Sequence, residues 1–410
     1  MLLTRPLCLR LIKSPLLASR PASTFKMGKK SKVVPESHFR LVHPAISESS
    51  SPIVDTHTHL ASTFEAYRHK YPAGDYTTVF DFVRGLYVPA GVQQIVDVWC
   101  EAPVRPLWRE FADSALTEDD RQKLWGGVGY WFVMGVHPHE ARLYTDAVEA
   151  DIIDAMAHPR CVGWGEMGLD YHYDNSPRPV QQEVFTRQLR CAVRLNKPLT
   201  IHTREADEDT ERILKEVVPK EHRIHIHCFT DSPAFAQRLL DWFPNLYIGI
   251  TGVITYTTNI DTSTTVRNMF SPPTSSSSSS DTDTSTTLSQ AVANVSLSPP
   301  QDATSEDNKL RILLETDAPY MVPAPIYTLP GLVGKKLPLC HSGMVPWTAG
   351  FVAALLPQSP KLPSAGEADG AKNGEVEAET NDGEGKNEGG WDAARVMRVA
   401  RENARAVYGV

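Results

Sequence analysis

The chain has 410 residues, of which 41% are hydrophobic and 22% are charged, and its formal net charge at pH 7 is -8. These proportions are those of a globular protein, and the length allows one large hydrophobic core or two ordinary ones. The acidic balance excludes a generally basic surface for nucleic acid, so any nucleic-acid contact must be local or mediated by metal ions. No apolar run reaches the roughly 18 residues of a bilayer-spanning helix, so we expect no membrane segment.

We expect residues 1–49 to form an N-terminal extension. Up to Glu36 the segment contains basic residues but no carboxylate, and its first 26 residues are typical of a mitochondrial presequence. The alternative is a tail from an upstream start codon, with Met27 as a second start. The six cysteines are scattered without a Cys-x-x-Cys pair, which favours free thiols in a reducing compartment. We therefore expect a cytoplasmic or nuclear protein, or a mitochondrial one if the presequence interpretation holds.

From residue 50 onward, short apolar runs alternate with helical patterns. Each run is nearly continuously apolar or rich in glycine, as strands buried on both faces should be. The predicted strands are 53–55, 92–98, 129–136, 161–165, 198–201, 223–227, 246–250 and 311–316. Helical spacing of apolar residues lies between several of them, and Asp231-Ser232-Pro233 is a typical helix start. Eight strand–helix units predict a (β/α)8 TIM-type barrel.

Two segments break this alternation, and we interpret both as disordered insertions. Residues 257–308 are dominated by Ser, Thr and Asp, and residues 357–390 are acidic and rich in Gly and Glu. Neither composition buries enough apolar surface to offset the entropy lost on ordering. The predicted domain order is the N-terminal extension 1–49, the first part of the barrel 50–256, the Ser/Thr-rich insertion 257–308, the last strand and following helix 309–356, the acidic segment 357–390, and a C-terminal helix 391–410.

Polar side chains follow the predicted strands at their carboxyl ends. His57 and His59 follow the first strand two residues apart, so they share one face of it. The other strand ends carry Glu166, His202, His227 and Asp317. Taken singly, each is more often a hydrogen-bonded structural residue than a ligand. Together at one face of a barrel, they would be costly to bury without a ligand.

These imidazoles and carboxylates are enough to bind two divalent ions, with Glu166 as the bridging carboxylate that holds them about 3.5–4 Å apart. Such ions lower the pKa of bound water toward 7, which yields hydroxide at neutral pH. Asp317 could accept the proton as general base, and Arg204 could add charge-assisted hydrogen bonds to a phosphate. The mixed ligand set admits zinc, manganese or magnesium.

Six motifs resemble the TatD family of metal-dependent deoxyribonucleases, which have an amidohydrolase-type barrel. They are Asp55-Thr-His-Thr-His-Leu60, Gly135-Val-His-Pro-His-Glu140, Gly165-Glu-Met-Gly-Leu-Asp170, Ile201-His-Thr-Arg204, His227-Cys-Phe229 and Glu315-Thr-Asp-Ala-Pro-Tyr320. The resemblance covers residues 52–256 and 309–321, and more weakly the last helix.

The resemblance implies a role for each site residue. His57, His59 and Asp317 would bind one metal, His202 and His227 the other, and Glu166 would bridge them. His137 and Arg204 would lie near the substrate phosphate. It also implies a nuclease that acts on DNA by hydrolysing phosphodiester bonds with a two-metal site.

The chain departs from the family in the long loops 61–90 and 100–127 and in the stretch 327–347. A fungal subgroup of the family is similar in these respects and is described mainly as binding a cell-cycle regulatory protein. The alternatives are therefore a barrel hydrolase of a non-nucleic substrate, such as a cyclic amide, and a regulatory protein that binds a partner through its acidic or Ser-rich insertion. Related hydrolases often use a carboxylated lysine where this chain has Glu166, which favours the nuclease.

Overall fold

The computed structural model describes residues 34–43, 52–271, 306–358 and 390–410, all of which belong to one unit, Val34–Val410. The expected presequence and most of the two expected insertions lie outside these residues. None of the helices in the described ranges has the length and apolarity needed to cross a membrane.

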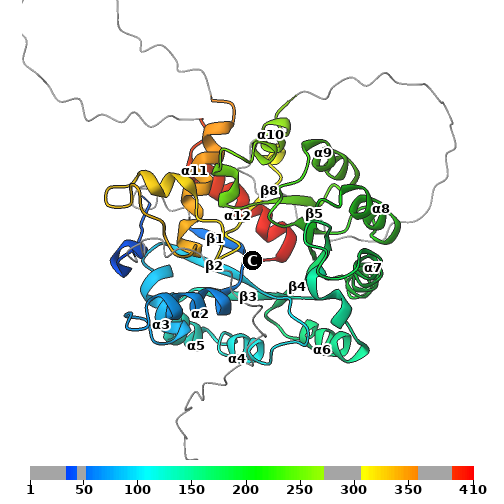
Figure 1. The fold of residues 1–410 in the computed structure, drawn as a ribbon, viewed down its shortest axis with the longest axis horizontal. Coiled ribbons are helices and arrows are strands. Elements are labelled where there is room, and N and C mark those ends of the chain that lie inside the picture. Colours follow the sequence, from blue (N-terminus) through cyan, green and yellow to red (C-terminus); the bar gives the residue numbers. More distant parts are fainter. Residues whose placement is uncertain (1–33, 44–51, 272–305, 359–389) are drawn as a thin grey trace, which may run out of the picture. The chain divides into compact units, whose positions relative to one another are not determined.

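All eight predicted strands are present, and they form one parallel sheet in chain order, β1 to β8 (Figure 1). Their bounds are β1 Ile53–Thr58, β2 Val92–Trp99, β3 Gly129–Met134, β4 Cys161–Asp170, β5 Leu199–Arg204, β6 Ile224–Ile226, β7 Leu246–Ile250 and β8 Ile312–Leu314. Most strand residues are buried, which explains why the strands read as apolar runs rather than as alternating patterns.

The sheet closes into a barrel where β1 meets the segment after β8. Thr58 and Ala318 form a parallel bridge, the Asp317 amide donates to the His57 carbonyl at 2.9 Å, and the His59 amide donates to the Ala318 carbonyl at 3.0 Å. The buried Asp55 carboxylate also accepts hydrogen bonds from the Thr316 amide and hydroxyl. The (β/α)8 expectation is confirmed, and the closure draws His57, His59 and Asp317 together.

Helices surround the sheet (Figure 1). The α-helices are α2 Leu60–Lys70, α3 Val79–Phe82, α4 Leu107–Asp113, α5 Glu118–Asp120, α6 Asp146–Met156, α7 Arg178–Arg194, α8 Asp207–Val217, α9 Pro233–Trp242, α10 Asp261–Asn268, α11 Val345–Leu355 and α12 Ala393–Tyr408. Short 3-10 helices are η1 Glu36–Phe39, η4 Pro138–Leu143, η5 Gly252–Thr255, η6 Asp307–Lys309, η7 Ala324–Thr328 and η8 Ser342–Met344. Two π-helical turns are η2 Val83–Tyr87 and η3 Arg121–Trp125.

Capping residues bound α9 and α12, and the start of α9 is the one that the sequence indicates. Ser232 caps α9 by accepting from the Phe235 amide at 3.3 Å, and Pro233 occupies the first turn. Asp392 caps α12 by accepting from the Arg395 amide at 2.7 Å. Gly409 ends α12 with a φ of 78°, a left-handed conformation that glycine adopts without a steric penalty.

The end of α12 packs against the barrel interior. Buried residues at this end form a hydrophobic cluster with buried strand residues. The cluster consists of Val54, Val96, Val98, Cys100, Val133, Leu313, Ala404, Val407, Tyr408 and Val410. The Tyr408 hydroxyl lies 2.7 Å from the Thr200 hydroxyl and 2.8 Å from His225 Nδ1. The C-terminal helix therefore contributes directly to the core of the barrel.

The predicted insertion 257–308 begins too early. Residues 261–268 form α10, whose Thr262 and Val266 are buried. The Thr262 hydroxyl donates to the Phe229 carbonyl at 2.8 Å. At the other end, Asp307 forms ion pairs with Arg395 at 2.8 Å and with Arg398 at 3.0 Å. The polar sequence concealed this helix because its buried positions are mostly Thr and Ser.

We predict that deleting residues 273–304 and 360–388 together leaves the barrel folded, with a melting temperature within about 3 °C of the full chain. The physical reason is that their composition adds little to a hydrophobic core. A longer deletion that starts at residue 262 removes α10 and should lower the melting temperature markedly more. Thermal unfolding of the three chains checks this, and equal melting temperatures for both deletions would contradict the role given to α10.

Candidate metal centre

The structure brings the predicted ligands together at the carboxyl ends of the strands. His57 and His202 lie in the last residues of β1 and β5, and Glu166 lies within β4. His59 and His227 follow β1 and β6 directly, and Asp317 follows β8 after two residues. Glu166 is 3% exposed and His57 is fully buried. Because parallel strands end at the same edge, residues more than 250 positions apart in the chain meet here.

One oxygen of Glu166 faces the first predicted metal set. Its Oε2 atom lies 3.4 Å from His57 Nε2 and 3.8 Å from His59 Nε2. Asp317 Oδ1 lies 3.4 Å from His59 Nε2 and 3.8 Å from His57 Nε2. These donors converge on a common point, as the ligands of one ion would.

The other oxygen of Glu166 faces the second set. Its Oε1 atom lies 2.9 Å from His202 Nδ1, 2.9 Å from His227 Nε2 and 3.2 Å from His137 Nε2. His137, which the sequence places near the substrate phosphate, thus also lies within reach of a metal bound between Glu166 and His202. A carboxylate whose two oxygens face two groups of imidazoles has the arrangement of a bridging ligand.

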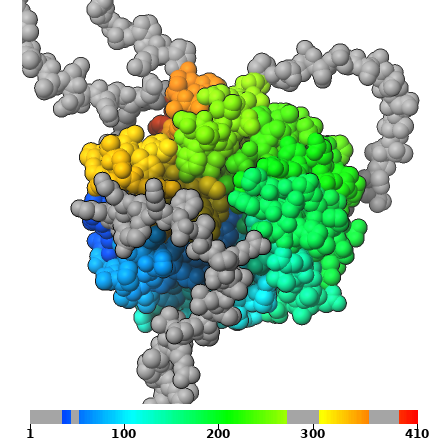
Figure 2. Space-filling view, viewed as in Figure 1, coloured from blue at the N-terminus to red at the C-terminus, as the bar shows by residue number. Residues whose placement is uncertain are grey.

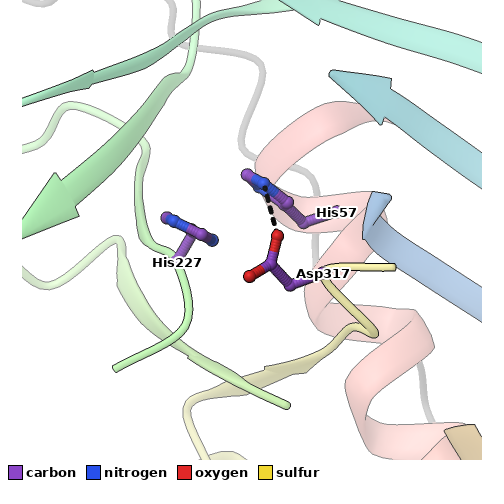
Figure 3. Close-up of side chains that lie close together, drawn as sticks. All are labelled: His57, His227 and Asp317. Atoms are coloured by element: carbon purple, nitrogen blue, oxygen red, sulfur yellow. Dashed lines mark ion pairs between the residues drawn. The ribbon is translucent and has the colours of Figure 1, made fainter. Parts of the chain in front are cut away.

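Figure 3 shows His57, His227 and Asp317 around one space. The rings of His57 and His227 stack with centroids 3.9 Å apart and planes 12° apart. A dashed line in the figure marks the contact between His57 and Asp317. Their ligand atoms lie within 4.8 Å of one another, so His227 sits where the two predicted sets meet.

These residues fit divalent metal. Neither ring nitrogen of the buried His57 makes a hydrogen bond with any described residue, and the same holds for His227 Nδ1. A buried imidazole nitrogen without a partner is costly, and ligation of a cation would satisfy it. Imidazoles with carboxylates are the donor set that zinc and manganese accept.

The pKa shifts follow from burial and from opposite charges. Burial lowers the pKa of both His57 and His137 to about 4, which leaves them neutral. Burial also disfavours charge on His59 and His202. A hydrogen bond to Asp317 nevertheless raises the pKa of His59 to about 9. Hydrogen bonds to Asp170 and Glu166 raise that of His202 to about 9. Burial would raise the pKa of Glu166, yet the neighbouring imidazoles hold it well below its usual range, so this carboxylate is ionised.

The predicted strand 161–165 ends before Glu166, and this boundary is wrong. β4 continues through Asp170, so Glu166 lies within the strand. Gly165 and Gly168 have φ values of 151° and 152°, and a side chain at either would collide with the backbone of β5. The glycines therefore serve the close approach of β4 to β5.

The sequence analysis did not identify two carboxylates that contact the ligand imidazoles, Asp170 and Glu315. Asp170 Oδ2 lies 2.9 Å from His139 Nε2 and 3.3 Å from His202 Nε2, so it orients the His202 ring. The fully buried Glu315 lies 2.8 Å from His225 Nε2 and 3.8 Å from His227 Nδ1. Carboxylates that fix ligand imidazoles are a regular part of metal sites. Both residues stand within the motifs quoted above, which was the available signal.

The ligands open into a cleft of about 780 Å³, lined also by His137, Tyr173 and Arg204. The Arg204 guanidinium lies 5.0 Å from the centre of the Tyr173 ring and forms no ion pair with a described residue. An unpaired guanidinium beside a metal-type cluster suits a phosphate. The structure thus places both predicted substrate-binding residues in the same cleft as the ligands.

Comparisons with known proteins agree with this geometry. Residues 54–272 match the family model described as TatD related DNase. A human protein named 3'-5' RNA nuclease TATDN2 is 33% identical over 314 residues, which are 74% of this chain and 33% of that protein. The protein of Shigella flexneri named 3'-5' ssDNA/RNA exonuclease TatD is 37% identical over 122 residues, 30% of this chain and 46% of that protein.

The chain thus spans about a third and about half of the lengths of these two curated relatives. A solved structure of a TatD family hydrolase from Entamoeba histolytica superposes with a TM-score of 0.56 at 14% identity, over 88% of this chain and 99% of that one. At that identity the likeness supports the fold alone. The family model covers more than half of the chain and includes β1 to β7; the chain belongs to the TatD family.

Proposed function

We propose that the protein is a metal-dependent hydrolase of phosphodiester bonds, a TatD-type deoxyribonuclease that uses two divalent ions. The observation that carries the proposal is the position of Glu166. One of its oxygens faces His57 and His59, and the other faces His202 and His227. A site for a single ion has no need of a carboxylate between two groups of imidazoles.

In this proposal, His57, His59 and Asp317 would hold one ion, His202 and His227 would hold the other, and Glu166 would contribute to both sites. When bound, the ions supply positive charge at the phosphoryl oxygens and lower the pKa of water to near neutrality.

Two carboxylates of the chain take part in the reaction or position its groups. Asp317 accepts the proton of the attacking water at its carboxylate. Burial would raise the pKa of this carboxylate, but the hydrogen bond from His59 lowers it. Asp170 holds the His202 ring in place.

Arg204 and His137 bind the phosphate that is to be cleaved. Arg204 has no acidic partner among the described residues and reaches the cleft beside Tyr173. His137 is neutral, because burial lowers its pKa to about 4, so it can donate a hydrogen bond to a phosphate oxygen without charge repulsion from the ions.

We predict that Arg204→Ala lowers kcat/KM for a DNA oligonucleotide roughly 10- to 100-fold, the worth of a charge-assisted hydrogen bond, and leaves metal content unchanged. Arg212→Ala, on the outer surface of α8, is the matched control and should change neither quantity. A loss of metal in Arg204→Ala would contradict a role confined to phosphate binding.

The names of the relatives support a nucleic-acid substrate. The human relative is named an RNA nuclease and the bacterial one a nuclease of single-stranded DNA and RNA. A regulatory protein without activity would have no need of the complete ligand set. A cyclic-amide hydrolase does not account for the unpaired Arg204 in the cleft that the ligands line.

The test is an assay of the purified full chain on single-stranded DNA, double-stranded DNA and RNA, with and without EDTA. We expect cleavage of DNA that EDTA abolishes and that zinc, manganese or magnesium restores. Cleavage of RNA alone would replace the deoxyribonuclease assignment by a ribonuclease. Absence of metal-dependent cleavage of all three, and of bis(p-nitrophenyl) phosphate, would overturn the proposal.

A further inference from the structure

A second groove, of about 740 Å³, adjoins the catalytic cleft. Tyr320 and Met321 line both hollows. The rest of the groove is formed largely by the segment after β8, including Tyr327, Lys335 and Lys336. This segment includes much of the stretch 327–347, which the sequence comparison with the family motifs predicts to differ from the usual family pattern. It lies within the part of the chain coloured yellow at the surface in Figure 2.

The groove has a local charge opposite to that of the whole protein. The chain carries a net charge of -8, yet the residues that line this groove include two lysines and no carboxylate. Both lysines are exposed, and neither pairs with an acid in the described residues, whereas Lys215 pairs with Glu211 at 2.7 Å. Two unpaired cations in a hollow attract a polyanion, although exposed lysines by themselves are ordinary.

Tyr320 stands at the boundary between the cleft and the groove. Its side chain is 60% exposed, while its amide donates to the Asp317 carbonyl at 3.0 Å, which fixes its backbone beside the metal centre. An exposed aromatic ring is a surface on which an unpaired nucleobase stacks. A strand that leaves the metal centre toward the groove must pass this ring.

The walls of the groove are held in place. The Tyr256 hydroxyl donates to the Val322 carbonyl at 3.0 Å, and the Ala324 amide donates to the Thr255 hydroxyl at 2.8 Å. The Cys340 amide donates to the Pro319 carbonyl at 2.9 Å. Ile326, Leu332, Leu337 and Leu339 are buried beneath the surface. A groove built in this way costs little to organise on binding.

We propose that this groove binds the single-stranded polynucleotide chain beyond the nucleotide at the metal centre, with a base stacked on Tyr320 and phosphates at Lys335 and Lys336. The inference rests on the proposed function and adds to it a binding groove outside the metal centre, formed by the segment after β8. A duplex is disfavoured because its paired bases have no free face for Tyr320.

The test is the affinity for a fluorescent DNA oligonucleotide of about 12 nucleotides, measured by anisotropy in EDTA so that no cleavage occurs. We expect Lys335→Ala/Lys336→Ala to raise Kd about 10-fold. The plot of log K against log salt should also become less steep by about 1.4, because each phosphate contact on a single strand contributes about 0.7 to the steepness. Lys123→Ala/Lys220→Ala removes two exposed lysines that line neither hollow, and should leave Kd and slope unchanged.

Hydrolysis of bis(p-nitrophenyl) phosphate by the metal-loaded chain separates the two claims. This substrate is too short to reach the groove, so the groove variant should hydrolyse it at the wild-type rate. An unchanged Kd and salt slope in the groove variant would overturn the inference while the proposed function stands. Failure of the wild-type chain to hydrolyse this ester would instead count against the proposed function, and Kd would still report on the groove.

Discussion

Glu166→Gln should lower the metal content of the purified chain from about two ions to one or fewer and reduce nuclease activity by a factor on the order of 100 or more. Glutamine keeps the size and one oxygen of the side chain but removes its charge. The two cations would then repel each other across a short distance without a bridging anion. Glu166 is 3% exposed, so little water could take over that role.

Metal analysis by mass spectrometry beside a plasmid-digestion assay checks this result. Glu183→Gln, at an exposed position of α7, makes the same chemical change away from the cluster, and His69→Ala removes an exposed imidazole of α2. Both controls should keep two ions and full activity. If Glu166→Gln also kept both, the bridging role would be wrong.

Asp317→Asn should lower kcat about 1,000-fold, within the range that removal of a general base produces. The Asp317 carboxylate is held ionised by His59 and the neighbouring imidazoles, so it can accept a proton at neutral pH. Its φ of 51° lies in the left-handed region, which both Asp and Asn tolerate. The substitution should therefore leave the backbone of the site intact.

Because the asparagine oxygen can still ligate a cation, metal content should fall less than kcat does. Measuring kcat and metal content on the same preparation shows whether Asp317 acts as a general base or only as a metal ligand. Asp119→Asn, at an exposed position of α5, is the matched control and should change neither. Loss of one ion together with a proportional loss of kcat would show that Asp317 acts only as a ligand.

The strands and the ligands could be predicted because each leaves a local signal. Strands buried on both faces read as apolar runs, and even the short β6 and β8 were detected in this way. His57, His202 and His227 stand at the ends of such runs, and the barrel topology brings those ends together. The alternation of strands and helices was therefore sufficient to predict both the fold and the composition of the cluster.

Other features depend on contacts between distant segments, so the sequence does not reveal them locally. α10 has mostly polar residues and is a helix because Thr262 and Val266 pack against the barrel. Asp170 and Glu315 look like ordinary motif residues until their carboxylates are seen beside His202 and His225. The groove beyond Tyr320 requires the folded course of the whole segment after β8, which no periodicity indicates.

The most direct test of the two-metal account is a crystal structure of the full chain with manganese or zinc and its anomalous difference map. The account predicts two peaks about 3.5–4 Å apart, one bonded to His57, His59 and Asp317, the other to His202 and His227, and both to Glu166. A single peak, or two peaks that leave Glu166 unbonded, would contradict it.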